Sequence, residues 1–119
     1  MSELGSQAVE AVQAVVEREE EADAILRQAV AELAGRYGAF AGVRFVEEGE
    51  LALGPAAGAP AAVATAVPVR FRDATVAELV TSTALDGDDL AAWERIAELV
   101  APYCLVGWDT GGVAWDPAA

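Results

Sequence analysis

Residues 63–83 read VATAVPVRFRDATVAELVTST, and this stretch predicts a β-hairpin. From residue 63 to residue 71, apolar or hydroxyl-bearing side chains occupy every second position, as in a strand with one buried face. Residues 72–75 supply the expected turn, in which Asp73 can bond to its own backbone. Residues 76–81 then return in strand-favouring types. Because an isolated hairpin is only marginally stable, we expect further strands and helices around it.

Residues 6–34 are rich in Ala, Glu, Gln, Leu and Arg and contain no proline, which predicts one continuous helix ending at Gly35. Apolar side chains recur along it in steps of four and three, and only Glu19 interrupts the pattern. At 1.5 Å per residue such a helix is about 42 Å long, longer than a small sheet is wide. We therefore expect its first half to form a homodimer interface through Val9, Val12, Val15 and Val16.

Two shorter strands are expected at residues 43–47 and 51–53, joined by a tight turn at Gly49. The Gly- and Pro-rich residues 54–60 read as a loop. A second helix is expected to begin at Asp88 or Asp89 and to end near Ala101, where Pro102 follows. Residues 104–115 allow a short terminal hairpin.

This order of elements predicts an α+β fold, in which N- and C-terminal helices pack on one face of an antiparallel sheet. The 119 residues suit one domain. We divide it into the N-terminal helix (residues 1–35), the sheet and second helix (39–101) and a tail (102–119).

Net charge is −13 and the chain contains neither lysine nor histidine, which argues against nucleic acid and anionic membranes as partners. The absence of histidine also removes the usual metal sites and histidine-based acid–base catalysis, so we expect no cofactor. No apolar run approaches the ~20 residues of a membrane span, and no secretion signal is recognisable. Together with the single Cys104, which permits no internal disulfide, these features predict a cytoplasmic protein.

Several short motifs resemble the GAF domain and, within that family, the free methionine-(R)-sulfoxide reductases. FAGVR at residues 40–44 looks like the start of their first strand, and LALGPAAGAPA at residues 51–61 is similar to their Leu-x-Leu-Gly-Pro-x-x-Gly-x-Pro-Ala stretch. VPV at residues 67–69 and residues 76–83 look like their late strands. The likeness covers residues 39–100 and implies a shortened GAF-like domain.

The departures from that family imply that the reductase activity is absent. Ala62 stands where the family has a cysteine, and the segment with the further cysteines is missing. Val80 and Ser82 stand where the family has carboxylates. Sulfoxide reduction needs an attacking thiolate and a resolving thiol, and Cys104 lies outside the matching positions.

We therefore expect a non-catalytic, GAF-like sensory or binding and dimerisation module, a homodimer whose further partner is a small-molecule ligand or a protein. Two alternatives are a residual thiol enzyme that uses Cys104 and a ligand-free assembly or adaptor subunit. Polar and aromatic side chains expected to reach a ligand are Arg44, Arg70, Glu78 and Trp108, although salt-bridged or solvated positions would also explain the charged ones. Trp108 or Trp115 is expected to cover the sheet face that the missing segment exposes, so deletion after Pro102 should promote aggregation.

Overall fold

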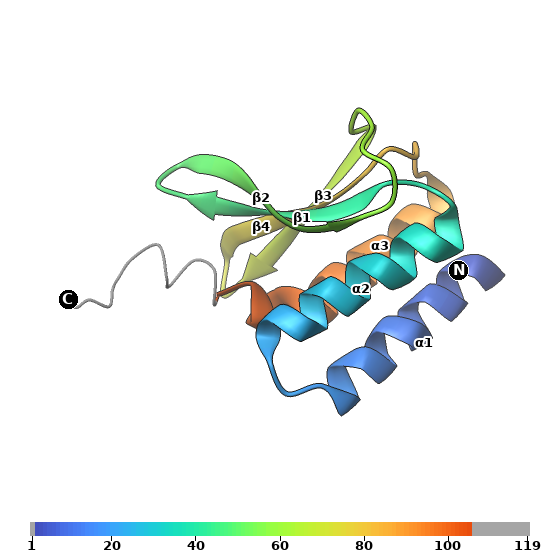
Figure 1. The fold of residues 1–119 in the computed structure, drawn as a ribbon, viewed down its shortest axis with the longest axis horizontal. Coiled ribbons are helices and arrows are strands. Elements are labelled where there is room, and N and C mark those ends of the chain that lie inside the picture. The colour runs from blue at the N-terminus through green and yellow to red at the C-terminus, as the bar shows by residue number, and fades with distance from the viewer. Residues whose placement is uncertain (1, 106–119) are drawn as a thin grey trace.

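The computed structural model describes residues 2–105, which form three layers (Figure 1). The elements are α1 (Glu3–Arg18), α2 (Ala22–Tyr37), β1 (Ala41–Glu47), β2 (Glu50–Ala57), β3 (Thr65–Phe71), β4 (Ala74–Thr81), α3 (Gly87–Val100) and the 3₁₀ turn η1 (Ala101–Cys104). The strands form one antiparallel sheet in the order β2-β1-β4-β3. The α+β class and the packing of helices on one sheet face are thus confirmed.

The β3–β4 hairpin forms where the sequence predicts it, with a tighter turn. Arg72 and Asp73 alone join the strands, and both have positive φ (53° and 71°). Two such residues in succession are typical of a type I′ turn, whose twist suits a hairpin. On β3, Val67 and Val69 are buried while the alternate positions are exposed, which confirms the alternation of the strand.

The prediction of a single N-terminal helix is wrong, because the chain leaves helical geometry between Arg18 and Ala22. Glu19 and Glu21 adopt extended conformations (ψ 146° and 133°). A continuous helix would align like charges three or four positions apart, such as Glu17 with Glu21 and Glu19 with Asp23. The break instead places Asp23 in the first turn of α2, where the helix dipole favours a carboxylate.

After the break, α1 forms an outer layer that packs on α2 and α3 rather than on the sheet (Figure 1). Val12 and Val15 are completely buried inside the chain, and Val9 and Val16 pack partly against the core. The N-terminal helix therefore does not extend beyond its own domain, and Val12 and Val15 are not available for the expected dimer interface. One chain already covers the apolar stripe of α1.

The second strand is longer than the sequence predicts, because β2 continues to Ala57 through part of the expected loop. The β1–β2 register shifts between Gly42 and Arg44, which leaves Gly54 and Pro55 in a bulge. A Cβ at Gly54 would overlap the ring of Phe45, so this bulge requires glycine.

The last helix agrees closely with its expected range. It begins at Gly87, with Asp86 at the N-cap position, and gives way to η1 before Pro102. Trp93 and Ile96 of this helix are completely buried in the core beneath the sheet. The expected terminal hairpin beyond residue 105, together with Trp108 and Trp115, lies outside the described residues. Within residues 2–105, none of the helices has both the length and the apolar character needed to cross a bilayer.

Candidate functional site

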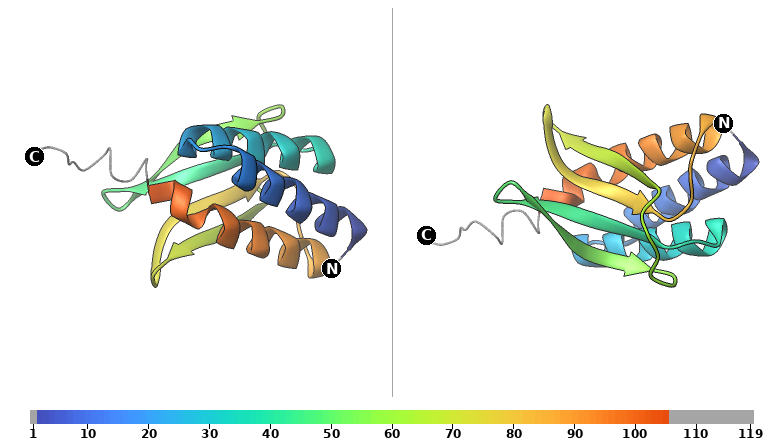
Figure 2. Two further views of the ribbon diagram at one scale, coloured as in Figure 1. Left: turned by 90° about the horizontal axis from the view of Figure 1, so that it is seen from below. Right: turned by 90° about the horizontal axis from the view of Figure 1, so that it is seen from above.

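One face of the sheet packs on α2 and α3, and no described helix lies over the other face (Figure 2, right). The connection between β2 and β3 (residues 58–64) crosses one end of the sheet, and the hairpin turns lie at the opposite end. We call this surface the open face. It consists of the residues that alternate with the helix-facing core residues of the four strands: Leu51, Leu53, Gly42, Arg44, Val46, Glu78, Val80, Ala66 and Pro68. Two of them, Gly42 and Val80, are buried, so this end of the face is not exposed.

A row of four residues crosses the middle of the open face from edge to edge. Leu53 of β2 is opposite Arg44 of β1, Arg44 is opposite Glu78 of β4, and Glu78 is opposite Pro68 of β3. Residues opposite each other in adjacent strands point to the same side of the sheet. The row therefore places two charged side chains between two apolar ones.

Arg44 and Glu78 form an ion pair in this row. Arg44 Nη2 donates to Glu78 Oε1 at 2.6 Å, and the two side chains are 29% and 23% exposed. Arg44 Nε is buried and has no hydrogen-bond partner in the part of the chain that the structure describes. A buried donor without a partner costs about 1–3 kcal/mol, which offsets part of what the ion pair contributes to stability.

Apolar side chains surround the pair. Leu51 and Leu53 are 47% and 59% exposed, and they lie two residues apart on the same side of β2. Phe40, Leu53 and Ala56 close around Gly42, where a Cβ would lie 3.2–3.3 Å from each of them. The exposed apolar surface therefore lies toward the β2 edge, whereas the packing of Phe40 around Gly42 at the start of β1 is buried.

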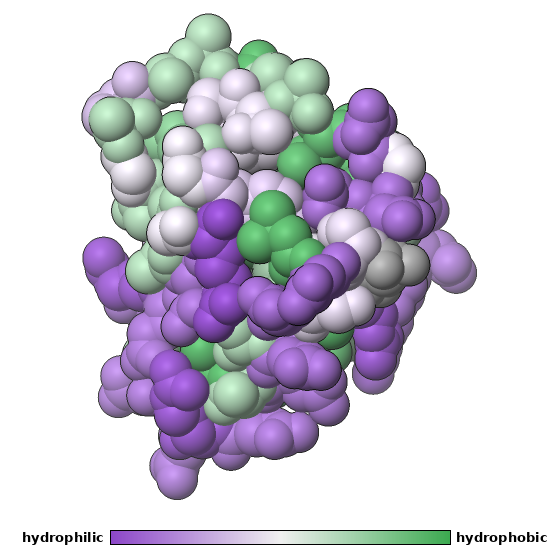
Figure 3. Space-filling model, turned by 90° about the vertical axis from the view of Figure 1, so that its right-hand side faces the viewer, coloured by the Kyte–Doolittle hydropathy of each residue, from purple (hydrophilic) through white to green (hydrophobic). Residues whose placement is uncertain are grey.

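Charge is distributed unevenly between the layers. Residues 3–37 and 86–105, which include the helices, contain 13 acidic residues and four arginines, a net charge of −9. Residues 41–81 contain five acidic residues and three arginines, a net charge of −2. No residue from 51 to 69 is charged. Seen from one side, hydrophilic residues gather on the lower, helical part of the molecule and apolar or neutral ones on the upper part (Figure 3).

The structure brings together two of the four side chains predicted to bind a ligand, Arg44 and Glu78. Arg70, on the edge strand β3, is exposed, and its Nη2 donates to the backbone oxygen of Asp73 at 3.2 Å. Arg70 thus serves the hairpin turn. The fourth predicted residue, Trp108, lies outside residues 2–105.

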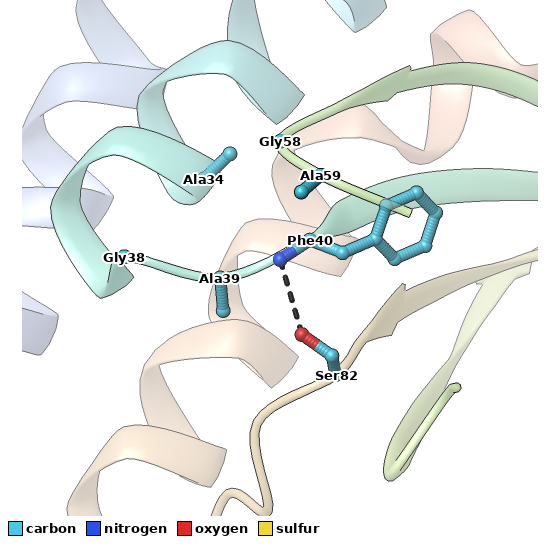
Figure 4. Close-up of a pocket in the computed structure, with 7 residues that line it drawn as sticks. All are labelled: Ala34, Gly38, Ala39, Phe40, Gly58, Ala59 and Ser82. Atoms are coloured by element: carbon cyan, nitrogen blue, oxygen red, sulfur yellow. Dashed lines mark hydrogen bonds between the residues drawn. The ribbon is translucent and has the colours of Figure 1, made fainter. Parts of the chain in front are cut away.

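Two shallow hollows lie away from the ion pair. One, of about 280 Å³, is formed by small side chains and by Phe40, whose backbone N–H donates to Ser82 Oγ at 3.1 Å (Figure 4). It has no charged residue in its lining: Ala34, Gly38, Ala39, Phe40, Gly58, Ala59 and Ser82. The other, of about 380 Å³, lies between β3 and α3 and is lined by Val67, Pro68, Arg70, Glu94, Ala97 and Glu98. Neither hollow is lined by Arg44 or Glu78.

Cys104 is completely buried in the core beneath the sheet. Burial raises the pKa of its thiol from an ordinary value of 9.0 to about 12. At neutral pH the thiolate, which is the nucleophilic form, is therefore scarce. Among the described residues, no group of three or more histidine, cysteine or carboxylate side chains is arranged to hold a metal ion.

A second polar cluster, which sequence reasoning missed, joins the three helices. Ser2 Oγ and the Tyr37 hydroxyl both donate to Asp89 Oδ1, at 2.7 and 3.1 Å. Burial and the hydrogen bond to Asp89 raise the pKa of Tyr37 from 10.0 to about 12. Trp93 meets the Tyr37 ring edge to face, with centroids 5.6 Å apart. The cluster ties the starts of α1 and α3 to the end of α2, and Ser2 also caps α1.

Comparisons of this chain with protein-family models, with curated proteins and with solved structures find no match.

Proposed function

We propose that this chain is a non-catalytic, GAF-like binding module whose recognition surface is the open face. The observation that carries this proposal is the half-buried Arg44–Glu78 pair in the middle of an exposed apolar surface. Binding sites are typically apolar with a few polar groups that fix orientation. The open face has that composition, and the GAF resemblance of residues 39–100 also favours a binding role.

A role in binding explains the Arg44–Glu78 ion pair better than a role in stabilising the fold. Partly exposed ion pairs contribute only about 0–1 kcal/mol, and apolar residues of similar size often serve as well at such positions. On an apolar surface, however, a guanidinium and a carboxylate side by side give a partner both donors and acceptors. A bound molecule would thus be oriented by the pair and held by the flanking leucines.

The burial of Cys104 supports the non-catalytic part of the proposal. A thiol enzyme needs an accessible thiolate, and Cys104 is inaccessible with a raised pKa. We expect no turnover of free methionine sulfoxide with a thiol reductant. Turnover that disappears in Cys104→Ala would contradict this and favour the residual-enzyme alternative.

The binding surface can be tested with 8-anilinonaphthalene-1-sulfonate, an apolar fluorescent anion, titrated into the dilute full chain. We expect saturable binding that weakens about tenfold in Leu53→Glu, because the new carboxylate repels the sulfonate and removes apolar surface. Ala91→Glu adds the same charge at an exposed position on α3 and is the matched control. Equal binding by the wild type and both variants would contradict a recognition surface on the open face.

A further inference from the structure

We infer that the partner of the open face is a second copy of this chain, bound face to face in a weak, concentration-dependent dimer. This inference rests on the proposed function, since it names the partner of the same surface. It moves the expected homodimer from α1, whose apolar stripe is already buried within one chain, to the sheet.

The central row of the open face is complementary to itself. Read across the sheet, it is Leu53, Arg44, Glu78 and Pro68. A two-fold axis parallel to the strands, running between β1 and β4, reverses the row in the partner. Arg44 of each chain then faces Glu78 of the other, and Leu53 faces Pro68. Interfaces of this kind, with the same patch on both copies, are the commonest in homodimers.

Charge on the rest of the molecule favours the same arrangement. Two chains of net charge −13 repel each other unless their acidic surfaces stay apart. Packed sheets lie about 10 Å apart and each helix layer adds about 10 Å, so the two helical layers would be about 30 Å apart. That separation exceeds the Debye length of about 8 Å at physiological ionic strength. A partner bound through the helices would meet the net charge of −9 directly.

The sheet edges are poor alternatives for self-association. Each outer strand contains a proline, Pro55 in β2 and Pro68 in β3. Proline lacks the N–H that a ladder of strands needs, and its presence is a recognised protection of edge strands. Pairing edge to edge would leave gaps in the ladder, whereas pairing face to face leaves the edges unchanged.

The size of the face predicts the strength of the dimer. Four strands at ~4.8 Å spacing and about seven residues at ~3.3 Å give a face of roughly 440 Å², or about 900 Å² for both copies. This is an upper bound, because Gly42 and Val80 on the face are already buried within the chain. Interfaces below about 1,200 Å² are usually weak and transient. We therefore expect a monomer–dimer equilibrium rather than an obligate dimer.

The first test is sedimentation velocity of the full chain over a wide range of concentrations. We expect the dimer fraction to rise with concentration and the association constant to fall at least about tenfold in Leu53→Glu, which places acid on the open face. Ala91→Glu should associate like the wild type. A chain that is monomeric throughout, or a dimer that Leu53→Glu leaves unchanged, would overturn the inference.

The second test is disulfide capture between two variants, Leu53→Cys and Pro68→Cys. Because the two-fold arrangement places these positions opposite each other, the mixture should crosslink faster on mild oxidation than either variant alone. Cys104 is buried and should not take part. Equal rates in the mixture and in the separate variants would overturn the inference.

One competing occupant is residues 106–119 of the same chain. If a chain ending at Leu105 dimerises through Leu53 and the full chain does not, the tail covers the face and the inference is wrong. The dye titration is made on the dilute monomer and is independent of these results. Dye binding at the open face without dimerisation would leave the proposed function standing and remove only the second copy as partner.

Discussion

At the scale of single residues, Arg44 and Glu78 set the polarity of the open face. Both were candidate binding residues because they are polar side chains within expected strands. That they lie opposite each other depends on the β1–β4 pairing, which joins strands more than 30 residues apart and leaves no local signal. Arg70 was also a candidate, but a bulge after Val69 and its bond to the hairpin turn give it another role.

We predict that replacing one member of the pair costs more stability than replacing both. Glu78→Leu leaves a half-buried guanidinium without its partner, and the free energy of unfolding should fall by about 1–2 kcal/mol. Combined with Arg44→Leu, it should return to within about 1 kcal/mol of the wild type. Urea unfolding followed by CD measures both changes. A double variant less stable than Glu78→Leu would show that the pair itself stabilises the fold.

Raised pKa values predict a loss of stability at alkaline pH. Cys104 and Tyr37 titrate near 9.0 and 10.0 when unfolded and near 12 when folded, so the folded chain holds more protons between pH 9 and 12. The contribution of these two groups to the free energy of unfolding is therefore fully present below pH 9 and falls as pH rises above it. Tyr37→Phe should reduce the slope above pH 10. Stability that does not change from pH 8 to 11 would contradict these shifts.

At the scale of elements, local patterns located the four described strands, with β2 too short, but not the helix break. Alternation and turn chemistry are properties of neighbouring residues, so the β3–β4 hairpin could be predicted from residues 63–83 alone. The break after Arg18 occurs in a stretch without glycine or proline, where helix propensity remains high. Packing of α1 on α2 and α3 overrides that propensity. The one sequence signal was Glu19, where the apolar pattern failed.

A double substitution in α1 distinguishes burial of this helix within one chain from a dimer interface on it. Val12→Glu with Val15→Glu would yield a folded monomer if these residues formed a dimer interface. Because both are completely buried within the chain, we predict instead that the variant unfolds, with a loss of at least about 3 kcal/mol. Thermal denaturation followed by CD decides between them. A stable, folded variant would contradict the packing of α1.

We predict opposite effects on stability for alanine substitutions at Gly54, in the β2 bulge, and at Gly35, inside α2. Gly54→Ala should lower stability by about 1–3 kcal/mol, because its Cβ overlaps the Phe45 ring. Gly35→Ala lies inside α2 with nothing within 4 Å of the new Cβ, so it should raise stability by about 0.5–1 kcal/mol. Urea unfolding of both variants is the measurement. A neutral Gly54→Ala would mean that the bulge tolerates a side chain.

At the scale of the whole molecule, the fold separates charge from apolar surface. The helical layer carries most of the negative charge, and the sheet presents an open face with one ion pair among exposed leucines. Composition predicted the acidity but not its separation, which follows from placing all three helices on one side of the sheet (Figure 1). Because of this asymmetry, a second acidic chain meets less electrostatic repulsion at the open face than at the helices.

The most direct test of this account is methyl NMR of the full chain as its concentration is raised. We predict that the resonances of Leu51, Leu53 and Val46, which lie on the open face, shift progressively. Those of Val9 and Val16 on α1 should stay fixed. Shifts confined to α1, with the methyl groups of the open face unchanged, would contradict the account.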